Sequence, residues 1–184
     1  VLVLAWQSNM IGWVTSVDDL SPDQRAVQTN VLFYGPDETG STWGWLVPPT
    51  VSENRFGPEI SLGQYLADNG PYDRVAQVKY AASGTNLTWD WNHTASGWAY
   101  TQMLLRAQAA FQQLQVENPD RRVFVAVYFW MQGEADDQDA AMAAGYAANL
   151  TGLIAQVRID FSDPLLPVFV GRIRTGQFAY ADVV

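Results

Sequence analysis

Short, continuously apolar runs alternate with longer helical patterns along this chain, and the alternation constrains the fold more than any other feature. Four of these runs predict buried strands, at Val1 to Trp6, Arg74 to Ala81, Arg122 to Trp130 and Leu166 to Ile173. A weaker fifth run covers Val31 to Tyr34. Such runs are typical of strands that are covered on both faces of a sheet.

Between the strands, apolar residues recur at the three- and four-residue spacing of an amphipathic helix. The clearest helical segments are Tyr100 to Val116 and Asp139 to Ile159, and a shorter one over Ile60 to Asp68 should end at the Asn69-Gly70-Pro71 breaker. Strands that alternate with helices form βαβ units. We therefore expect one α/β domain over residues 1–184, a three-layer α/β/α sandwich with a central parallel sheet of the flavodoxin-like kind.

The residue content of the chain excludes several classes of function. A formal net charge of −9, with ten Lys and Arg that form no basic stripe, argues against a nucleic-acid partner. The chain has no cysteine, which excludes a thiolate zinc site and a cysteine nucleophile. No apolar run approaches the roughly 20 residues of a membrane span. We expect no metal, no organic cofactor and no membrane partner, but a neutral or acetylated substrate.

Polar residues follow three of the predicted strands, where each strand ends. These segments are Gln7-Ser8-Asn9, Ser83-Gly84-Thr85-Asn86 and Gln132-Gly133-Glu134. Ligands of open parallel sheets sit beyond the carboxyl ends of the strands, so this convergence favours an active site. A serine between a buried strand and a helical turn, such as Ser8, has the position of a nucleophile. The alternative is that Ser8 is only a helix N-cap.

Four short motifs occur in an order that resembles the SGNH-type hydrolases. They are QSNM at 7–10, FGPE at 56–59, SGT at 83–85 and WMQGEAD at 130–136. Within that superfamily the chain is similar to the branch of sialate O-acetylesterase-like proteins and acetylxylan esterases of carbohydrate esterase family six. Any one motif is weak, but the ordered set covers nearly the whole chain and is fairly specific.

This resemblance implies a serine esterase that removes O-acetyl groups from a carbohydrate, such as acetylated xylan or sialic acid. Ser8 would attack the acetyl carbonyl and form an acetyl-enzyme that water splits later. Gly57 and Ser8 would supply backbone amides to the oxyanion hole. A group from Gly84 to Asn86, or the Gln132 side chain, would complete that hole.

The resemblance also makes Glu134 a candidate to orient the catalytic histidine, as an alternative to the Asp of a C-terminal Asp-x-x-His motif. Residues 136–139, which are acidic except for Gln138, are interpreted instead as a solvated helix N-terminus. The family's catalytic histidine lies in that C-terminal motif, whereas the only histidine here is His93, expected to have a surface or packing role. Because residues 170–184 resemble a strand and the beginning of a helix, we expect the chain to be truncated before the motif.

Tryptophans in or near the predicted loops suggest a sugar-binding surface, because aromatic faces stack on sugar rings. They are Trp43, Trp45, Trp89, Trp91 and Trp98. Trp6 is another candidate, since the family usually has a small residue there. Trp43 and Trp45 fall in the segment Tyr34 to Arg55, which the sequence presents as one long loop. These residues keep open a second function, an inactive esterase relative that acts as a carbohydrate-binding module. A nucleotide-binding domain would need a Gly-rich loop after the first strand, which the chain lacks.

Overall fold

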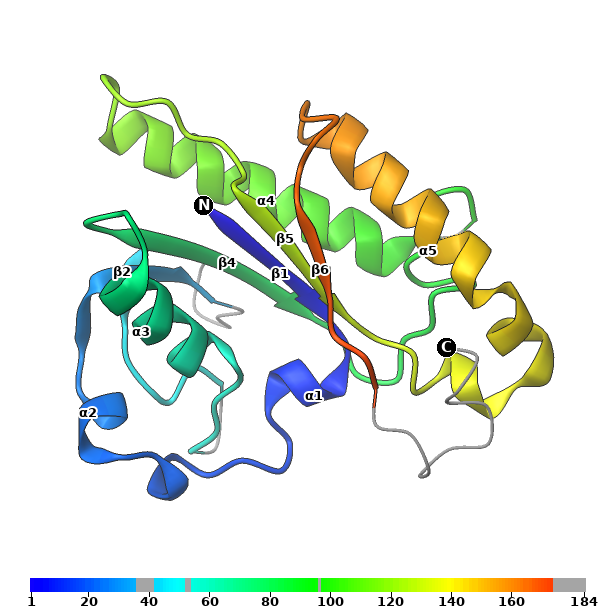
Figure 1. Cartoon of the computed structure of the whole chain (residues 1–184), viewed down its shortest axis with the longest axis horizontal. Coiled ribbons are helices and arrows are strands. Elements are labelled where there is room, and N and C mark those ends of the chain that lie inside the picture. The colour runs from blue at the N-terminus through cyan, green and yellow to red at the C-terminus, as the bar shows by residue number, and fades with distance from the viewer. Residues whose placement is uncertain (36–41, 52–53, 96, 174–184) are drawn as a thin grey trace.

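The computed structural model describes residues 1–35, 42–51, 54–95 and 97–173, and a six-stranded sheet runs through its centre (Figure 1). The strands are β1 (Leu2–Trp6), β2 (Gln28–Tyr34), β3 (Gly44–Leu46), β4 (Val75–Ala81), β5 (Val127–Met131) and β6 (Val168–Val170). Their order in the sheet is β3-β2-β4-β1-β5-β6. The first strand therefore lies inside the sheet, between β4 and β5.

Helices lie on both faces of this sheet. They are α1 (Ser8–Ile11), α2 (Pro22–Arg25), α3 (Glu59–Asn69), α4 (Trp98–Glu117) and α5 (Ala140–Asp160), with short 3-10 helices at Val17–Asp19 and Asp136–Gln138. Figure 1 shows α4 and α5 on one face and α3 on the other. The predicted α/β/α sandwich is confirmed. No helix in the described ranges is both long and apolar enough to cross a bilayer.

The sheet departs from the expected purely parallel one at a single edge. All neighbouring strands pair in parallel except β3, which is antiparallel to β2. This strand lies inside the segment Tyr34 to Arg55 that the sequence presents as one loop. Three residues are too short to show an alternating pattern, so the pairing of β3 with β2 could not be seen in the sequence.

Three strand boundaries also differ from the sequence prediction. The strand expected from Arg122 begins only at Val127, and the last one shrinks to β6, an edge strand that pairs only with β5. In contrast, β2 begins earlier than expected, at Gln28, because that residue pairs with Leu46 of β3. Pairing with a neighbour sets these limits more than the hydrophobicity of the run does. Residues 174–184, which include most of the predicted strand-and-helix ending, lie outside the described residues.

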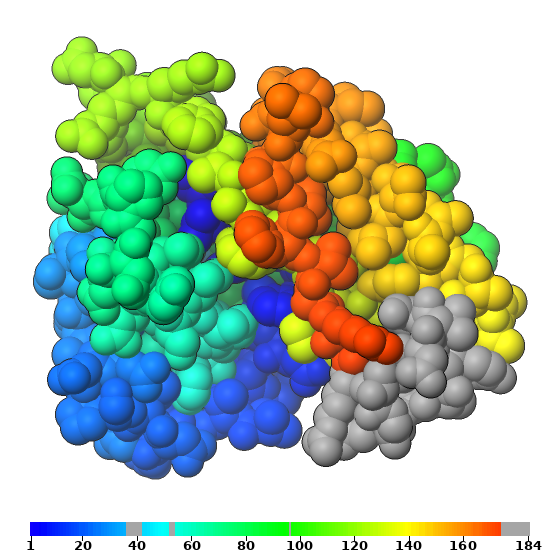
Figure 2. Space-filling model, viewed as in Figure 1, coloured from blue at the N-terminus to red at the C-terminus, as the bar shows by residue number. Residues whose placement is uncertain are grey.

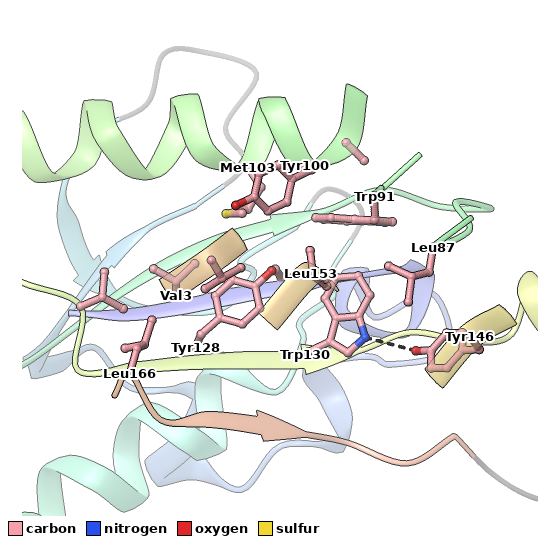
Figure 3. Packing of buried hydrophobic residues seen from close by; sticks show 14 residues of the cluster. Val3, Leu87, Trp91, Tyr100, Met103, Tyr128, Trp130, Tyr146, Leu153 and Leu166 are labelled. Carbon is pink, nitrogen blue, oxygen red and sulfur yellow. Dashed lines mark hydrogen bonds between the residues drawn. The ribbon is translucent and has the colours of Figure 1, made fainter. Parts of the chain in front are cut away.

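The larger hydrophobic core lies between the sheet and the helix pair α4 and α5. Figure 3 shows sheet residues such as Val3 and Tyr128 facing Met103 of α4 and Leu153 of α5. Helix α4 buries Ala99, Met103, Ala107 and Ala110, at the three- and four-residue spacing that predicted it. Three of these four side chains are alanines, which let the helix lie close to the sheet.

Adjacent strands bring the three polar segments of the sequence to one edge. Trp6, the last residue of β1, pairs with Ala81 at the end of β4 and with Met131 at the end of β5. The chain therefore leaves all three strands at the same level of the sheet. In the space-filling view, the dark-blue segment after β1 reaches the surface between the green segments on the left and the red end of β6 (Figure 2).

Candidate active site

Ser8 is the first residue of α1 and follows β1 after a single residue. The N-cap of this helix is Gln7, in extended conformation, so the alternative interpretation of Ser8 as an N-cap is wrong. The helix ends after one turn at Gly12, whose φ of 85° is left-handed. A Cβ at Gly12 would also collide with the Phe56 carbonyl, because the FGPE segment crosses directly against the turn. Ser8 is thus held, partly exposed, on a tight turn at the sheet edge.

The two side chains that flank Ser8 meet the carboxylate of Glu134. Asn9 Nδ2 donates to Glu134 Oε1. The Gln7 amide, with its nitrogen facing the acceptors, donates to Glu134 Oε2 at 3.1 Å and to the Thr85 carbonyl at 3.2 Å. Glu134 is only 8% exposed, so its carboxylate reaches solvent very little. The predicted convergence of the three strand ends is therefore real at the level of hydrogen bonds.

Gln132 extends this network away from Ser8. Its Nε2 donates to the Thr85 carbonyl at 3.0 Å and to Asp136 Oδ2 at 2.7 Å. The backbone carbonyl of Gln132 accepts from the hydroxyl of Tyr146 on α5. That hydroxyl in turn accepts from Trp130 Nε1 at 3.2 Å. Burial raises the pKa of that tyrosine, which keeps its hydroxyl protonated as a donor. The QGE segment is thus anchored at side chain and main chain.

Asp136 is a structural anchor that the sequence analysis misread. It is fully buried and accepts from the backbone N–H of Leu87 at 2.8 Å and of Thr88 at 3.2 Å. The interpretation of residues 136–139 as a solvated helix N-terminus is wrong for Asp136 and Asp137, which lie in the buried 3-10 turn before α5. Only Asp139 caps α5, accepting from two backbone N–H groups of its first turn.

The loop after β4 carries two of the predicted oxyanion-hole residues. Gly84 has a left-handed φ of 69°, and a Cβ built on it would meet nothing within 4 Å, so its surroundings are open. Asn86 stabilises the loop itself: its Oδ1 accepts from Trp89 N at 2.7 Å, and its N–H donates to Asp90 at 2.9 Å. The role of this loop in an oxyanion hole stays a prediction.

Gly57, another predicted donor, packs against α1, and its amide is already bonded. A Cβ here would collide with the Met10 carbonyl, so only glycine fits. The Gly57 N–H donates to Glu59 Oε1 at 3.0 Å, and Glu59 Oε2 pairs with Lys79 Nζ at 2.8 Å. Both charged side chains are fully buried. Burial lowers the pKa of Lys79, and the adjacent Glu59 carboxylate opposes that shift.

The tryptophans divide into buried and exposed ones. Trp91 is fully buried, packed edge-on against Tyr80 and Trp130, so the prediction that it binds substrate is wrong. Its indole belongs to the core beneath the loop. The indole Nε1 donates to Thr85 Oγ1, so its polar atom is satisfied there. In contrast, Trp89 is 55% exposed. Trp6 is half-buried, and its Nε1 is buried without a hydrogen-bond partner among the described residues.

His93 lies outside the network around Ser8. It is exposed, its ring centroid lies 6.2 Å from that of Tyr100 on α4, and its Cε1 lies near Gly152 of α5. This matches the packing role expected from the sequence. Among the residues that the structure describes, no group of three His, Cys, Asp or Glu side chains could hold a metal ion.

Solved structures with this fold include several longer chains. A protein from Arabidopsis thaliana has a TM-score of 0.76 at 20% identity, over 100% of this chain and 77% of its own. NanS has a TM-score of 0.67 at 15% identity, over 98% and 70%. A carbohydrate acetylesterase from Xanthomonas citri has a TM-score of 0.61 at 20% identity, over 93% and 40%. At these identities the likeness shows the fold alone.

Sequence comparison with whole families is more specific. No curated protein matches the chain significantly. However, the family model described as carbohydrate esterase, sialic acid-specific acetylesterase, matches residues 1–184, which is the entire sequence. The matched region therefore includes all four motifs and all the residues around Ser8. The chain belongs to this family of carbohydrate esterases.

Proposed function

We propose that this protein removes O-acetyl groups from a carbohydrate, with Ser8 as the nucleophile. The observation that carries the proposal is the turn at the carboxyl edge of the sheet, where Ser8 stands between two side chains bonded to Glu134. Membership of a carbohydrate esterase family supports the substrate class. The proposed steps need no metal or organic cofactor.

The reaction would proceed through an acetyl-enzyme. Ser8 Oγ attacks the acetyl carbonyl carbon and loses its proton to a base, and the sugar oxygen leaves as an alcohol after taking up a proton. Water then attacks the acetyl group on Ser8, releasing acetate and restoring the hydroxyl. Each attack places a negative charge on the carbonyl oxygen, which needs hydrogen-bond donors.

The present hydrogen bonds discriminate among the candidate donors. The Gly57 amide is bonded to Glu59, and Gln132 Nε2 is bonded to Thr85 and Asp136, so either group would have to leave a buried partner. The open surroundings of Gly84 favour the loop after β4 instead. We therefore assign the oxyanion to the Ser8 amide, at the start of α1, and to this loop.

Trp89 is the tryptophan best placed on that loop to contact a sugar ring. It is exposed, and it follows the Gly84 to Asn86 turn by three residues. Its backbone N–H is bonded to Asn86, so an indole stacked on a sugar would be linked to the proposed oxyanion loop. Acetylated xylan and O-acetylated sialic acid are the two substrate types to compare.

The test measures acetate release from p-nitrophenyl acetate, acetylated xylan and O-acetylated sialic acid. Ser8→Ala should lower kcat/KM by about a thousandfold or more, because the acetyl-enzyme cannot form. Ser61→Ala, on the exposed surface of α3, is the matched serine control and should keep full activity. A fluorophosphonate should label Ser8 in the parent protein and in Ser61→Ala, and should not label Ser8→Ala.

Two outcomes would overturn the proposal. Ser8→Ala with unchanged acetate release would show that another group performs the chemistry. A protein that binds these glycans but releases no acetate from any of them would be a carbohydrate-binding relative of the esterases.

A further inference from the structure

We infer that Glu134 is a positioning residue, which holds Ser8 from both sides through Gln7 and Asn9, rather than the partner of a catalytic histidine. This inference rests on the proposed function, because it assigns the nucleophile to Ser8. We call Gln7, Asn9 and Glu134 the amide clamp. It joins the residue before the nucleophile and the residue after it to one carboxylate from the segment that follows β5.

Both oxygens of the carboxylate are used in the clamp. Oε1 accepts from Asn9 and Oε2 from Gln7, and the side chain is 8% exposed. Hydrogen bonds to an ionised acceptor are about twice as strong as neutral ones, so the carboxylate is a strong anchor for the two amides. Little of its surface remains for an imidazole.

The FGPE segment packs against the turn that carries Ser8, whereas the short helix α1 adds little of its own. Helix α1 is four residues long, its N-cap makes no side-chain capping bond, and it is terminated at once by Gly12. A single helical turn is marginal by itself in water. The two side chains that flank the serine add a second restraint on its orientation, and both are bonded to Glu134.

The clamp is anchored to the rigid part of the site on one side only. Gln7 also donates to the Thr85 carbonyl, which accepts from Gln132, and Gln132 in turn is bonded to buried Asp136. Asn9 is exposed, and no other side-chain hydrogen bond is recorded for it within the described ranges. Asn9 can therefore rotate its amide, whereas Gln7 cannot without losing Thr85.

This asymmetry makes Glu134→Gln a discriminating variant. The new side chain can present its oxygen to Gln7 and its NH₂ to Asn9, which rotates to offer its own oxygen. Both contacts survive as neutral hydrogen bonds, so kcat should stay within about tenfold of the parent and the pH profile should not shift. Glu134→Ala removes both contacts and should lower kcat about a hundredfold or more, with KM nearly unchanged.

A charge exchange sharpens the test. Asn9→Asp places a second carboxylate against Glu134 and should impair the enzyme severely. In the double variant Asn9→Asp with Glu134→Gln, the charge has moved to position 9 and the amide to 134, so kcat should return to the Glu134→Gln level. Asp139→Asn is the matched control, because this exposed helix cap follows the same motif and touches no clamp residue.

A histidine partner predicts different results. Neutralising such a carboxylate costs about 10⁴-fold in kcat and alters the pH profile. If Glu134→Gln is as inactive as Glu134→Ala, and the charge exchange does not rescue it, the inference is wrong. Acetate release that survives Ser8→Ala would instead remove the proposed function.

A measurement that does not depend on activity separates the two failures. In the parent protein, the side-chain amide protons of Gln7, which is buried, should exchange slowly with solvent by NMR. They should exchange fast in Glu134→Ala and remain slow in Glu134→Gln. Fast exchange in the parent would overturn the clamp whether or not the protein is an esterase.

Discussion

Two buried carboxylates, Glu59 and Glu134, both connect to the turn that carries Ser8, and they differ in how their charge is balanced. Glu59 pairs with a buried cation, Lys79, and holds the FGPE segment against α1. Within the described ranges, the hydrogen bonds to the Glu134 carboxylate come from the neutral amides of Gln7 and Asn9. A buried ion pair needs both of its charges, because either one alone is strongly disfavoured in the interior. A carboxylate held by amides depends on the geometry of its donors instead.

The largest effect is expected when Lys79 loses its charge. Lys79→Met leaves Glu59 buried and unpaired, which should lower the free energy of unfolding by about 3–5 kcal/mol. Denaturant unfolding measures this loss. The double variant Lys79→Met with Glu59→Gln removes both charges, keeps an acceptor for the Gly57 N–H and should recover most of the stability. If Lys79→Met costs less than about 1 kcal/mol, the pair does not anchor the FGPE segment.

A smaller effect is expected where a carboxylate is satisfied by neutral donors. Asp136 accepts from Leu87 N, Thr88 N and Gln132 Nε2, so Asp136→Asn turns an NH₂ group towards donors. Leaving these groups unsatisfied should cost about 2 kcal/mol of unfolding free energy.

Asp139→Asn provides the control for Asp136 within the same acidic run. It should change stability by only a few tenths of a kcal/mol, because Asn is also a good N-cap. Equal effects of the two substitutions, measured by thermal unfolding, would mean that the buried and solvated members of the run do not differ.

The sequence predicted the fold where a pattern extended over many residues, and failed where pairing or packing decided. The apolar runs that predicted β1 and β4 needed no tertiary information, because strands covered on both faces are continuously apolar. In contrast, β3 exists only because β2 offers it an edge.

The same distinction holds in the site. The convergence of Gln7, Gln132 and Glu134 follows from the parallel sheet, and the contacts confirm it. The burial of Asp136 and Trp91 could not be predicted, because a run of acids is usually solvated and a loop has no periodicity to show which side faces inward. Their placement depends on the loop after β4 and the 3-10 turn before α5, which meet only in the folded chain.

Tyr128 extends the comparison to a buried polar group with neither cation nor amide. Its hydroxyl is fully buried, and no partner for it occurs in the described part of the chain. An unsatisfied buried hydroxyl costs about 1 kcal/mol or more, so Tyr128→Phe should raise the free energy of unfolding by about that amount. Tyr146→Phe is the matched control: it removes a hydroxyl bonded to Trp130 and Gln132 and should destabilise the protein.

The pH dependence of stability tests the same hydroxyl with a definite sign. Burial raises the pKa of Tyr128 above its ordinary value of 10.0. Above pH 10, therefore, the unfolded chain releases this proton while the native protein keeps it, and the free energy of unfolding falls as the pH rises. One such group contributes about 1.4 kcal/mol per pH unit. The advantage of Tyr128→Phe over the parent should thus grow above pH 10, and an advantage independent of pH would mean that the hydroxyl ionises normally in the native state.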